Sequence, residues 1–347
     1  MKVMYAVAFH EHGDPSVLRH QAVALPKLKA NDVWIEVKAV ALDRRDVWSR
    51  EGVVGVRHSL PQVPGSNVAG KVFKVGSAVT NVKTGDEVVL HSGISCRNCD
   101  MCTSGQEYFC PDFKIYGFHT QDGGYADLVS VPAASLISKP ASLSWEEAAS
   151  VSMPLLAAWH MLVEQANLRP GETVLILGAN NSMGAVAIQL AKNVLRAQVI
   201  AAVNNEAQAK QAKDLGADHV IDLSEQQIAN QIRSITNKRG VNVILGYVDE
   251  ANLEQSLRSL SPGGKVVLSG TPNGAHANVN LRYLFSKQLS LLGSLHGSKG
   301  ELLKAMKFVE KGQIKPVVAQ TMPLKKAAQA HELMASGDYF GSIVLTP

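Results

Sequence analysis

The chain lacks any long apolar segment. No uninterrupted apolar run approaches the ~18 residues that a membrane-spanning helix needs, and the start has neither a charged-then-apolar leader nor a secretory cleavage pattern. A large excess of charge of one sign is also missing, because the formal net charge is only +4. The sequence contains no block of lysines and arginines and no segment in which basic and aromatic residues alternate. These absences argue against a membrane or a nucleic-acid partner. We therefore expect a cytoplasmic protein that acts on a small molecule.

Internal repeats and low-complexity segments are also missing, and the composition is ordinary. Hydrophobic residues make up 46 % and charged residues 18 % of the 347 residues, which supplies a sizeable core. At about 150 residues per domain, this length predicts about two domains.

Cysteine is rare, and its distribution is informative. All four cysteines fall within fifteen residues: Cys96, Cys99, Cys102 and Cys110. This spacing predicts a tetrahedral Cys₄ site for one Zn²⁺, which is structural because the closed shell leaves no position for substrate. A disulfide framework does not suit so long a chain without a leader. Two alternatives stay open. One is an iron–sulfur cluster, although seven residues separate Cys102 from Cys110 where the bacterial ferredoxin pattern has three. The other is a set of reduced thiols without a metal.

The first ~130 residues follow the pattern of a β-rich domain. Apolar and polar side chains alternate over 33–39, as in a half-buried strand. Glycine turns at Gly85 and at 123–124 open further apolar runs. Short strands separated by glycine turns indicate a closed or partly closed barrel.

The pattern changes near Ser144, where the serine-to-glutamate spacing of a capping box predicts a helix start. An apolar strand over 173–177 follows, then a glycine-containing turn and a helix, and a second apolar strand over 198–203. Strands that alternate with helices predict parallel βαβ units and a doubly wound sheet. The fold class is therefore α/β.

The turn over 178–184 is a candidate phosphate-binding loop. A strand-to-helix turn with glycines brings backbone N–H groups close to a pyrophosphate. Only Gly178 and Gly184 are glycines here, and Asn181 and Ser182 fill the middle. Asparagine tolerates left-handed backbone, so we expect Asn181 to stand in for a glycine. Many βα turns carry two glycines, so this motif alone leaves dinucleotide binding open.

The whole chain resembles the medium-chain dehydrogenase/reductase superfamily, in its zinc-type alcohol dehydrogenase and quinone-oxidoreductase-like members. The four-cysteine lobe carries the resemblance together with the segments 37–42, 45–52, 64–70, 123–126, 185–192, 215–218 and 340–345. It implies a GroES-like β-barrel catalytic domain over 1–132 and 272–347, with the structural zinc lobe at about 91–112. It also implies a Rossmann dinucleotide-binding domain over 133–271.

The chain departs from that family at the catalytic zinc. The zinc enzymes place a cysteine where Asp43 stands, a histidine–glutamate pair where Ser66 and Asn67 stand, and a cysteine or acid near Met153. One carboxylate with a serine and a methionine makes a poor Zn²⁺ shell. We therefore expect the structural zinc without a catalytic one.

Without a Lewis acid, alcohol–nicotinamide hydride transfer loses its main charge stabilisation. The resemblance then implies an NAD(P)H-dependent oxidoreductase that transfers hydride to a quinone, an enone or another activated carbonyl. Two alternatives remain: a zinc-independent alcohol dehydrogenase, and a degenerate nucleotide-binding or regulatory homologue whose crowded turn has lost catalysis.

The resemblance also implies site residues. Asp43 would lie near the nicotinamide ribose or simply cap a loop, Asp46 would hold the barrel mouth, and Trp48 would line the cleft or pack. These three form the candidate catalytic set. The candidate nucleotide contacts are Gly178, Asn180, Asn181, Ser182, Met183, Gly184, Asn204, Asn205, Val248 and Gly270.

Cofactor choice and association follow from two further segments. NAD-preferring sites carry an acid at the end of the second strand, but this chain has Asn204 and Asn205 there, which favours NADP(H) over NAD(H). The usual phosphate-binding lysine and tyrosine are replaced by Gln208 and Leu223. The apolar segment 289–295 matches the strand that pairs across the family's two-fold axis, so we expect a homodimer.

Overall fold

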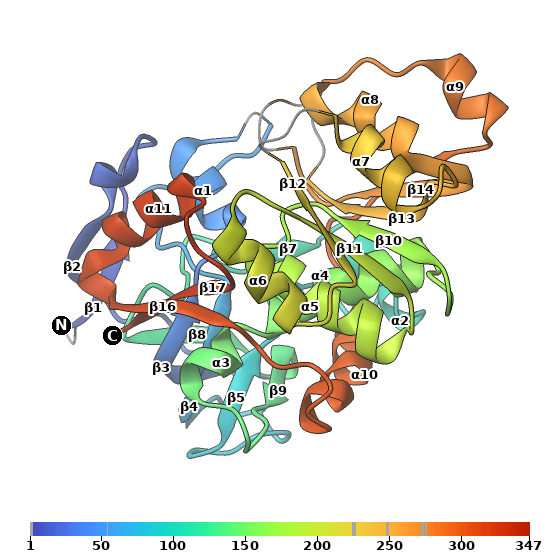
Figure 1. Ribbon diagram of the computed structural model, residues 1–347. Helices are drawn as coiled ribbons and strands as arrows, with labels where there is room; N and C mark the ends of the chain where they lie inside the picture. The colour runs from blue at the N-terminus through green and yellow to red at the C-terminus, as the bar shows by residue number, and fades with distance from the viewer. Residues whose placement is uncertain (1–2, 54, 224–226, 248–249, 272–273, 275) are drawn as a thin grey trace. The chain divides into compact units, whose positions relative to one another are not determined.

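The computed structural model describes residues 3–53, 55–223, 227–247, 250–271, 274 and 276–347 (Figure 1). Its contacts divide the chain into two compact units. Unit 1 comprises Met1–Met153, Ser298–Leu303 and Pro316–Pro347, and unit 2 comprises Pro154–Gly297 and Lys304–Lys315.

Unit 1 is built on a seven-stranded sheet of order β16-β17-β3-β4-β5-β9, in which β8 also pairs with β3. All pairs are antiparallel except β16 with β17. The strands are β3 (Asp32–Ala41), β4 (Asn67–Val75), β5 (Glu87–Leu90), β8 (Leu128–Pro132), β9 (Leu136–Ser138), β16 (Val318–Pro323) and β17 (Ser342–Thr346).

Strand β3 shows how the sequence forms this sheet. Val33, Ile35 and Val37 are buried on one face while the side chains between them are more exposed, as the alternation predicts. On β4, a Cβ at Gly70 would lie 2.2 Å from the Glu36 carbonyl oxygen. Glycine therefore allows the close approach beside the register shift between β3 and β4.

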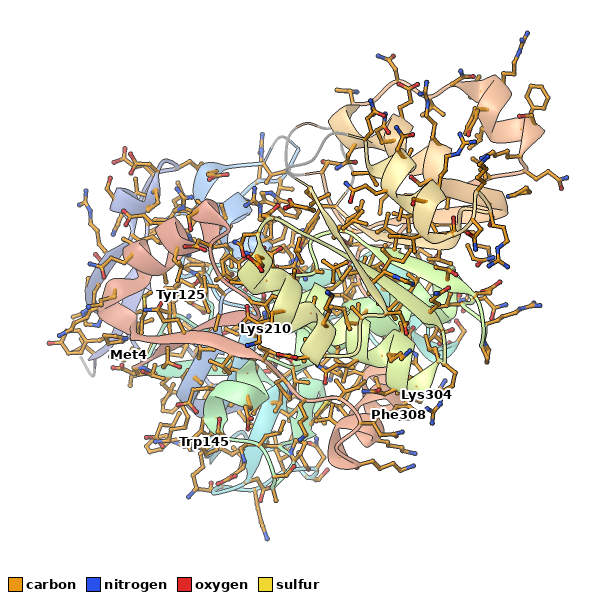
Figure 2. The ribbon with its side chains drawn as sticks, viewed as in Figure 1. Met4, Tyr125, Trp145, Lys210, Lys304 and Phe308 are labelled. Atoms are coloured by element: carbon orange, nitrogen blue, oxygen red, sulfur yellow. The ribbon has the colours of Figure 1, made fainter. Side chains whose placement is uncertain are left out.

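The remaining elements of unit 1 surround this sheet. They are β1 (Val3–Ala8) and β2 (Arg19–Ala24), which form a hairpin, α1 (Arg44–Glu51), β6 (Gly93–Ile94), α2 (Asp100–Thr103), η2 (Glu107–Phe109), β7 (Lys114–Ile115), α3 (Trp145–Ala149) and α11 (Ala327–Ser336), with short η1 (Pro15–Val17), η3 (Ala133–Ser135) and η6 (Leu324–Lys326). The capping box predicted at Ser144 is confirmed, because its side chain accepts from the Glu147 N–H and the Glu147 carboxylate accepts in return. Tyr125, labelled in Figure 2, is among the largest fully buried side chains of this core.

Unit 2 is a six-stranded parallel sheet of order β12-β11-β10-β13-β14-β15. This is the doubly wound order, in which the chain starts at a central strand and reverses direction once. The strands are β10 (Thr173–Ile176), β11 (Gln198–Val203), β12 (His219–Asp222), β13 (Val241–Gly246), β14 (Leu260–Leu268) and β15 (Ser290–Gly293).

Helices connect these strands. They are α5 (Ser182–Gln189), α6 (Glu206–Asp214), α7 (Ile228–Ile235), α8 (Glu250–Ser259) and α9 (Leu281–Ser286), with α4 (Ser152–Trp159) before the sheet and α10 (Lys299–Glu310) after it; α4 and α5 end in the π-helical turns η4 (His160–Gln165) and η5 (Leu190–Val194). The predicted α/β fold class and its doubly wound parallel sheet are confirmed.

The unit boundaries differ from the expected domain limits of 132 and 272. Residues 133–153 fall in unit 1 because α3 packs on β3 and β4. Residues 272–297 fall in unit 2 because β15 extends the parallel sheet beyond β14. Among the described residues, no helix is long and apolar enough to cross a bilayer.

Candidate functional site

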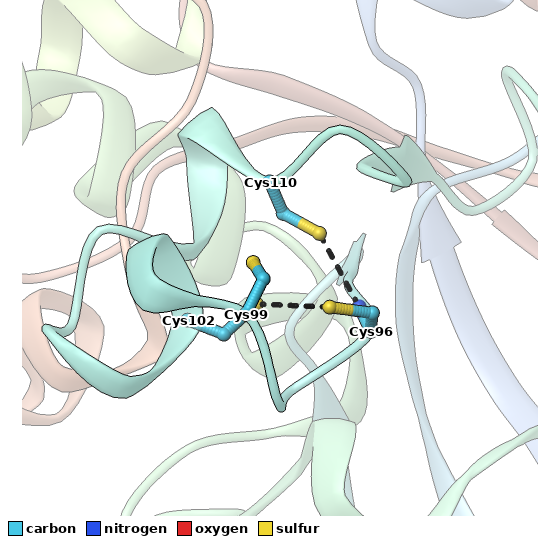
Figure 3. Close-up of side chains that lie close together, drawn as sticks. All are labelled: Cys96, Cys99, Cys102 and Cys110. Atoms are coloured by element: carbon cyan, nitrogen blue, oxygen red, sulfur yellow. Dashed lines mark hydrogen bonds between the residues drawn. The ribbon is translucent and has the colours of Figure 1, made fainter.

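The four cysteines converge on one point (Figure 3). Their sulfur atoms all lie within 4.8 Å of one another, and the Sγ atoms of Cys96 and Cys102 are 3.8 Å apart. Four sulfurs at about 2.3 Å from one Zn²⁺ stand about 3.8 Å apart in a tetrahedron. The cluster therefore fits a single structural zinc ion, and it is tighter than an iron–sulfur cube requires.

Local backbone geometry presents these thiols. Arg97 takes a left-handed φ of 66°, which turns the chain so that its N–H donates to Cys102 Sγ at 3.3 Å. The Cys96 N–H donates to Cys110 Sγ at 3.4 Å. Backbone N–H groups of Asn98 and Cys99 lower the pKa of Cys96 to about 6. The backbone thus favours a thiolate, the form that binds zinc, at Cys96. At Cys99 the N–H of Cys102 favours the thiolate too, but burial and the neighbouring thiols outweigh it and raise the pKa of Cys99 to about 11.

Lys299 fastens the zinc lobe to the rest of unit 1. Its backbone N–H donates to Glu107 Oε1 at 2.7 Å, and its Nζ donates to the carbonyls of Ala134 and Leu136 at 2.6 and 2.8 Å. Burial and the neighbouring Arg97 charge lower the pKa of Lys299.

The three candidate catalytic residues lie together on helix α1. Asp43 is its N-cap and Asp46 is the third helical residue, and the two form a capping box. The Asp46 carboxylate accepts the N–H of Asp43 at 2.8 Å and the N–H of Gly65 at 3.0 Å. Asp46 is 1 % exposed, so it holds the backbone in place and is not presented to a substrate. Trp48 is half-buried on the same helix.

Asp43 is held by a cation. Arg45 Nε donates to Asp43 Oδ1 at 2.9 Å. Burial alone would raise the pKa of Asp43, but Arg45 and a hydrogen bond from Asn67 outweigh burial and hold that pKa below its ordinary value. Burial, reinforced by the Asp43 charge, raises the pKa of Asp46 to about 7. The two carboxyl groups therefore differ in charge near neutrality, as neighbouring acids in a dry site do.

The other positions of the family's catalytic zinc carry hard or weak donors. Ser66 and Asn67 are each 1 % exposed, and neither the Ser66 hydroxyl nor Asn67 Oδ1 has a hydrogen-bond partner within the described ranges. Met153 Sδ accepts the Ser92 hydroxyl at 3.9 Å. In the part of the chain that the structure describes, only the four cysteines bring three or more metal-binding groups within reach of one ion.

The candidate phosphate-binding turn joins β10 to α5. Gly178 has a left-handed φ of 68°, and a Cβ at Gly184 would lie 2.3 Å from the Gly178 carbonyl oxygen. Gly184 therefore lets the helix pack directly on the turn, the role of the last glycine in dinucleotide fingerprints. The left-handed geometry expected at Asn181 is wrong. Its φ is −83°, and its side chain instead caps α5 by accepting the Gly184 N–H at 2.9 Å.

The described nucleotide candidates lie at one edge of the parallel sheet. The turn follows β10, Asn204 and Asn205 follow β11, and Gly270 follows β14, which places them at the carboxyl ends where such sheets bind ligands. The first N–H groups of α5, including those of Ser182 and Met183, have no partner inside the helix and suit a pyrophosphate. Asn180 is buried beside them. These residues fit a dinucleotide; Val248 lies outside the described residues.

Two residues that contact the candidate site or its neighbours, Arg45 and His331, were not predicted from the sequence. Arg45 pairs with Asp43, and a positive charge two residues from the acid was the available signal. His331 contacts Tyr125, 206 positions away. No local pattern could have indicated that contact.

Comparisons with known proteins agree with this geometry. Residues 29–141 match the alcohol dehydrogenase GroES-like domain, and residues 182–311 match the zinc-binding dehydrogenase family. The chain is similar to an NAD-dependent alcohol dehydrogenase of Saccharolobus solfataricus, with 32 % identity over 99 % of this chain and 100 % of the relative. It is also similar to a quinone oxidoreductase of Rattus norvegicus, with 30 % identity over 99 % of this chain and 98 % of the relative.

Among solved structures, a crystal structure of an NAD-dependent alcohol dehydrogenase matches with a TM-score of 0.95 and 36 % identity, over 99 % of this chain and 100 % of that one. The GroES-like part, the parallel sheet and the four-cysteine lobe define a zinc-binding dehydrogenase. The chain belongs to the medium-chain dehydrogenase/reductase superfamily, alongside its alcohol dehydrogenases and quinone oxidoreductases.

Proposed function

We propose that this oxidoreductase uses NAD(P)H to transfer hydride to a quinone, an enone or another activated carbonyl, without a catalytic zinc. The observation that carries the proposal is the set of donors at the positions where the family's zinc enzymes hold their catalytic metal. Ser66, Asn67 and Met153 supply neither thiolate nor imidazole, and the carboxylate of Asp43 is already paired with Arg45. A shell of this kind binds Zn²⁺ poorly.

The chain's own residues have binding and electrostatic roles. The N-terminal N–H groups of α5 would hold the pyrophosphate, and Gly184 leaves room for the close approach of helix and turn. The Arg45 guanidinium provides a fixed positive charge beside Asp43. A bound nicotinamide supplies the hydride, and fixed charges and hydrogen-bond donors stabilise the negative charge that develops on a carbonyl oxygen.

Two measurements test the proposal together. Oxidation of NADH and NADPH is followed spectrophotometrically against a panel of quinones and enones, and zinc is counted in the purified protein. We expect turnover with at least one acceptor and one zinc ion per chain. Inactivity with every acceptor, or a second zinc whose loss abolishes turnover, contradicts the proposal.

A zinc-independent alcohol dehydrogenase is the second candidate. The relatives named NAD-dependent alcohol dehydrogenase favour it. It is distinguished by alcohol oxidation driven by NAD⁺ or NADP⁺ in a protein that holds one zinc ion. A degenerate homologue, suggested by Asn181 and Ser182 in the turn, would show no saturable NADPH binding when energy transfer from tryptophan is followed.

Cofactor preference, association and location remain predictions. The end of β11 carries Asn204 and Asn205 rather than an acid, which supports NADP(H), whereas two of the relatives reported above are named NAD-dependent alcohol dehydrogenases. Comparing kcat/KM for NADPH and NADH decides between them.

Strand β15 ends the order of the parallel sheet, which supports a homodimer. Cell fractionation tests the cytoplasmic location.

A further inference from the structure

Three buried polar side chains meet inside unit 1, although they come from distant parts of the chain. The Tyr125 hydroxyl lies 3.4 Å from Asp46 Oδ2 and 3.1 Å from His331 Nε2. Asp46 is 1 % exposed, and Tyr125 and His331 are 0 % exposed. Figure 2 labels Tyr125 beside α11, the helix that carries His331. One hydroxyl proton thus faces two acceptors in a dry environment.

The backbone is shaped to hold the tyrosine ring there. A Cβ at Gly65 would lie 2.7 Å from Tyr125 Cδ1, and one at Gly124 would lie 2.4 Å from Val68 Cγ2. The N–H of Tyr125 donates to the Pro64 carbonyl at 2.9 Å. Gly65 therefore leaves the space that the ring occupies, and Gly124 lets the backbone next to Tyr125 pack against Val68.

The charges around this group decide where its proton resides. Among the described residues, Asp43 and Arg45 act on Asp46, and Arg50 acts on His331. Burial raises the pKa of Tyr125, as do Asp46 and Asp43, and Arg50 lowers it. Burial, with the Asp43 charge, raises the pKa of Asp46 to about 7. Burial, with Arg50, lowers the pKa of His331 to about 3. His331 Nδ1 has no hydrogen-bond partner in the described part of the chain, so a charged imidazolium, which carries a proton on both ring nitrogens, would have one N–H without an acceptor.

We propose that Asp46, Tyr125 and His331 are positioning residues that share protons and set the charge behind Asp43. When Asp46 is ionised, the Tyr125 O–H donates to Asp46 Oδ2. When Asp46 takes one proton from solvent, its own O–H donates to the Tyr125 oxygen, and the Tyr125 O–H turns to His331 Nε2. His331 is neutral in both states and keeps its single ring proton on Nδ1, so Nε2 is free to accept and one proton is gained in total.

This network acts on the active site through α1. The same Asp46 carboxylate anchors the Asp43 N–H at 2.8 Å, and Asp43 in turn pairs with Arg45. Protonation of Asp46 removes a negative charge beside that pair, which favours a reaction that builds negative charge on a substrate oxygen. This step rests on the proposed function, whereas the proton sharing itself does not.

Infrared difference spectroscopy tests the proton sharing without any assay of activity. The carboxylic-acid carbonyl band that disappears in the Asp46→Asn variant is followed against pH. Tyr125→Phe removes a donor to the ionised carboxylate, so the midpoint rises by about one pH unit. His331→Leu removes the competing acceptor and lowers the midpoint by a similar amount. His331→Asn keeps an acceptor and stays near the parent midpoint.

Tyr116→Phe is the matched control. Tyr116 is 3 % exposed, and its hydroxyl has no hydrogen-bond partner among the residues described, so its loss leaves the midpoint unchanged. Opposite shifts in Tyr125→Phe and His331→Leu support the network. Equal shifts in the two variants, or the same response from Tyr116→Phe, overturn it. If His331→Leu does not fold, Tyr125→Phe against Tyr116→Phe still decides.

The rate profile separates this inference from the proposed function. Once a substrate that the enzyme reduces has been identified, the rate of its reduction falls as pH rises through the Asp46 midpoint. In Tyr125→Phe this decrease occurs at a higher pH, by the same amount as the infrared midpoint. Shifts in the infrared titration with no reductase activity reject the function alone. Turnover with identical midpoints in Tyr125→Phe and Tyr116→Phe rejects the network alone.

Discussion

Asp46 makes the stability of the protein depend on pH in an unusual direction. Its pKa is raised to about 7 from 3.8, so between about pH 4 and pH 7 the folded chain holds a proton that the unfolded chain has lost. The free energy of unfolding contributed by this group therefore falls as pH rises through that window, by at most about 4 kcal/mol. Asp46→Asn removes the effect.

Urea unfolding of the parent and of Asp46→Asn at several pH values checks this expectation. The lowered pKa of His331 gives the opposite slope below about pH 6.5, but it is common to both proteins and cancels in their difference. The free energy of unfolding of the parent, relative to that of the variant, should fall from about pH 4 to pH 7 and level off above that. Parallel curves would mean that Asp46 is ionised throughout.

Asp43 serves two purposes that can be separated by substitution. Its side chain accepts the Arg45 N–H at the start of α1 at 3.0 Å, and its charge pairs with the Arg45 side chain at 2.9 Å. Asp43→Asn keeps the cap but not the charge, whereas Asp43→Ala loses both. We expect the alanine variant to be less stable than the asparagine variant by about 1 kcal/mol. Thermal unfolding compares them, and equal stability would show that the cap contributes nothing.

At the scale of elements, the join between β10 and α5 depends on Gly184. A Cβ there would lie 2.3 Å from the Gly178 carbonyl oxygen and 2.6 Å from Ala179 Cα. Gly184→Ala must therefore push α5 away from the turn, at a cost of about 1–3 kcal/mol. NADPH affinity should fall by about tenfold or more because the helix N–H groups move.

Gly300→Ala controls for this prediction, because its Cβ would meet only the Ser298 hydroxyl at 3.7 Å. Binding is read from energy transfer between tryptophan and NADPH. Unchanged affinity in Gly184→Ala would mean that the turn does not hold the nucleotide.

Sequence patterns predicted elements better than they predicted contacts. The capping box at Ser144, the alternation along β3 and the spacing of the four cysteines are local signals, and each has the expected structure. The prediction for Asn181 was wrong because asparagine suits both a left-handed backbone and a helix N-cap. The first N–H groups of α5 lack partners inside the helix, and the Asn181 side chain accepts one of them. The contact between Tyr125 and His331 depends on tertiary folding across 206 positions.

At the scale of the whole molecule, the edge of the parallel sheet bears on assembly. Strand β15 (Ser290–Gly293) ends the strand order, and Leu295, two residues beyond it, is 65 % exposed. An uncovered apolar edge invites pairing with a second copy. We expect twice the chain mass by light scattering at micromolar concentration, and a shift toward monomer in Leu295→Lys. Leu303→Lys, at a leucine of α10 that is 45 % exposed, should leave the mass unchanged. A monomeric parent protein, or equal behaviour of the two variants, would place any association elsewhere.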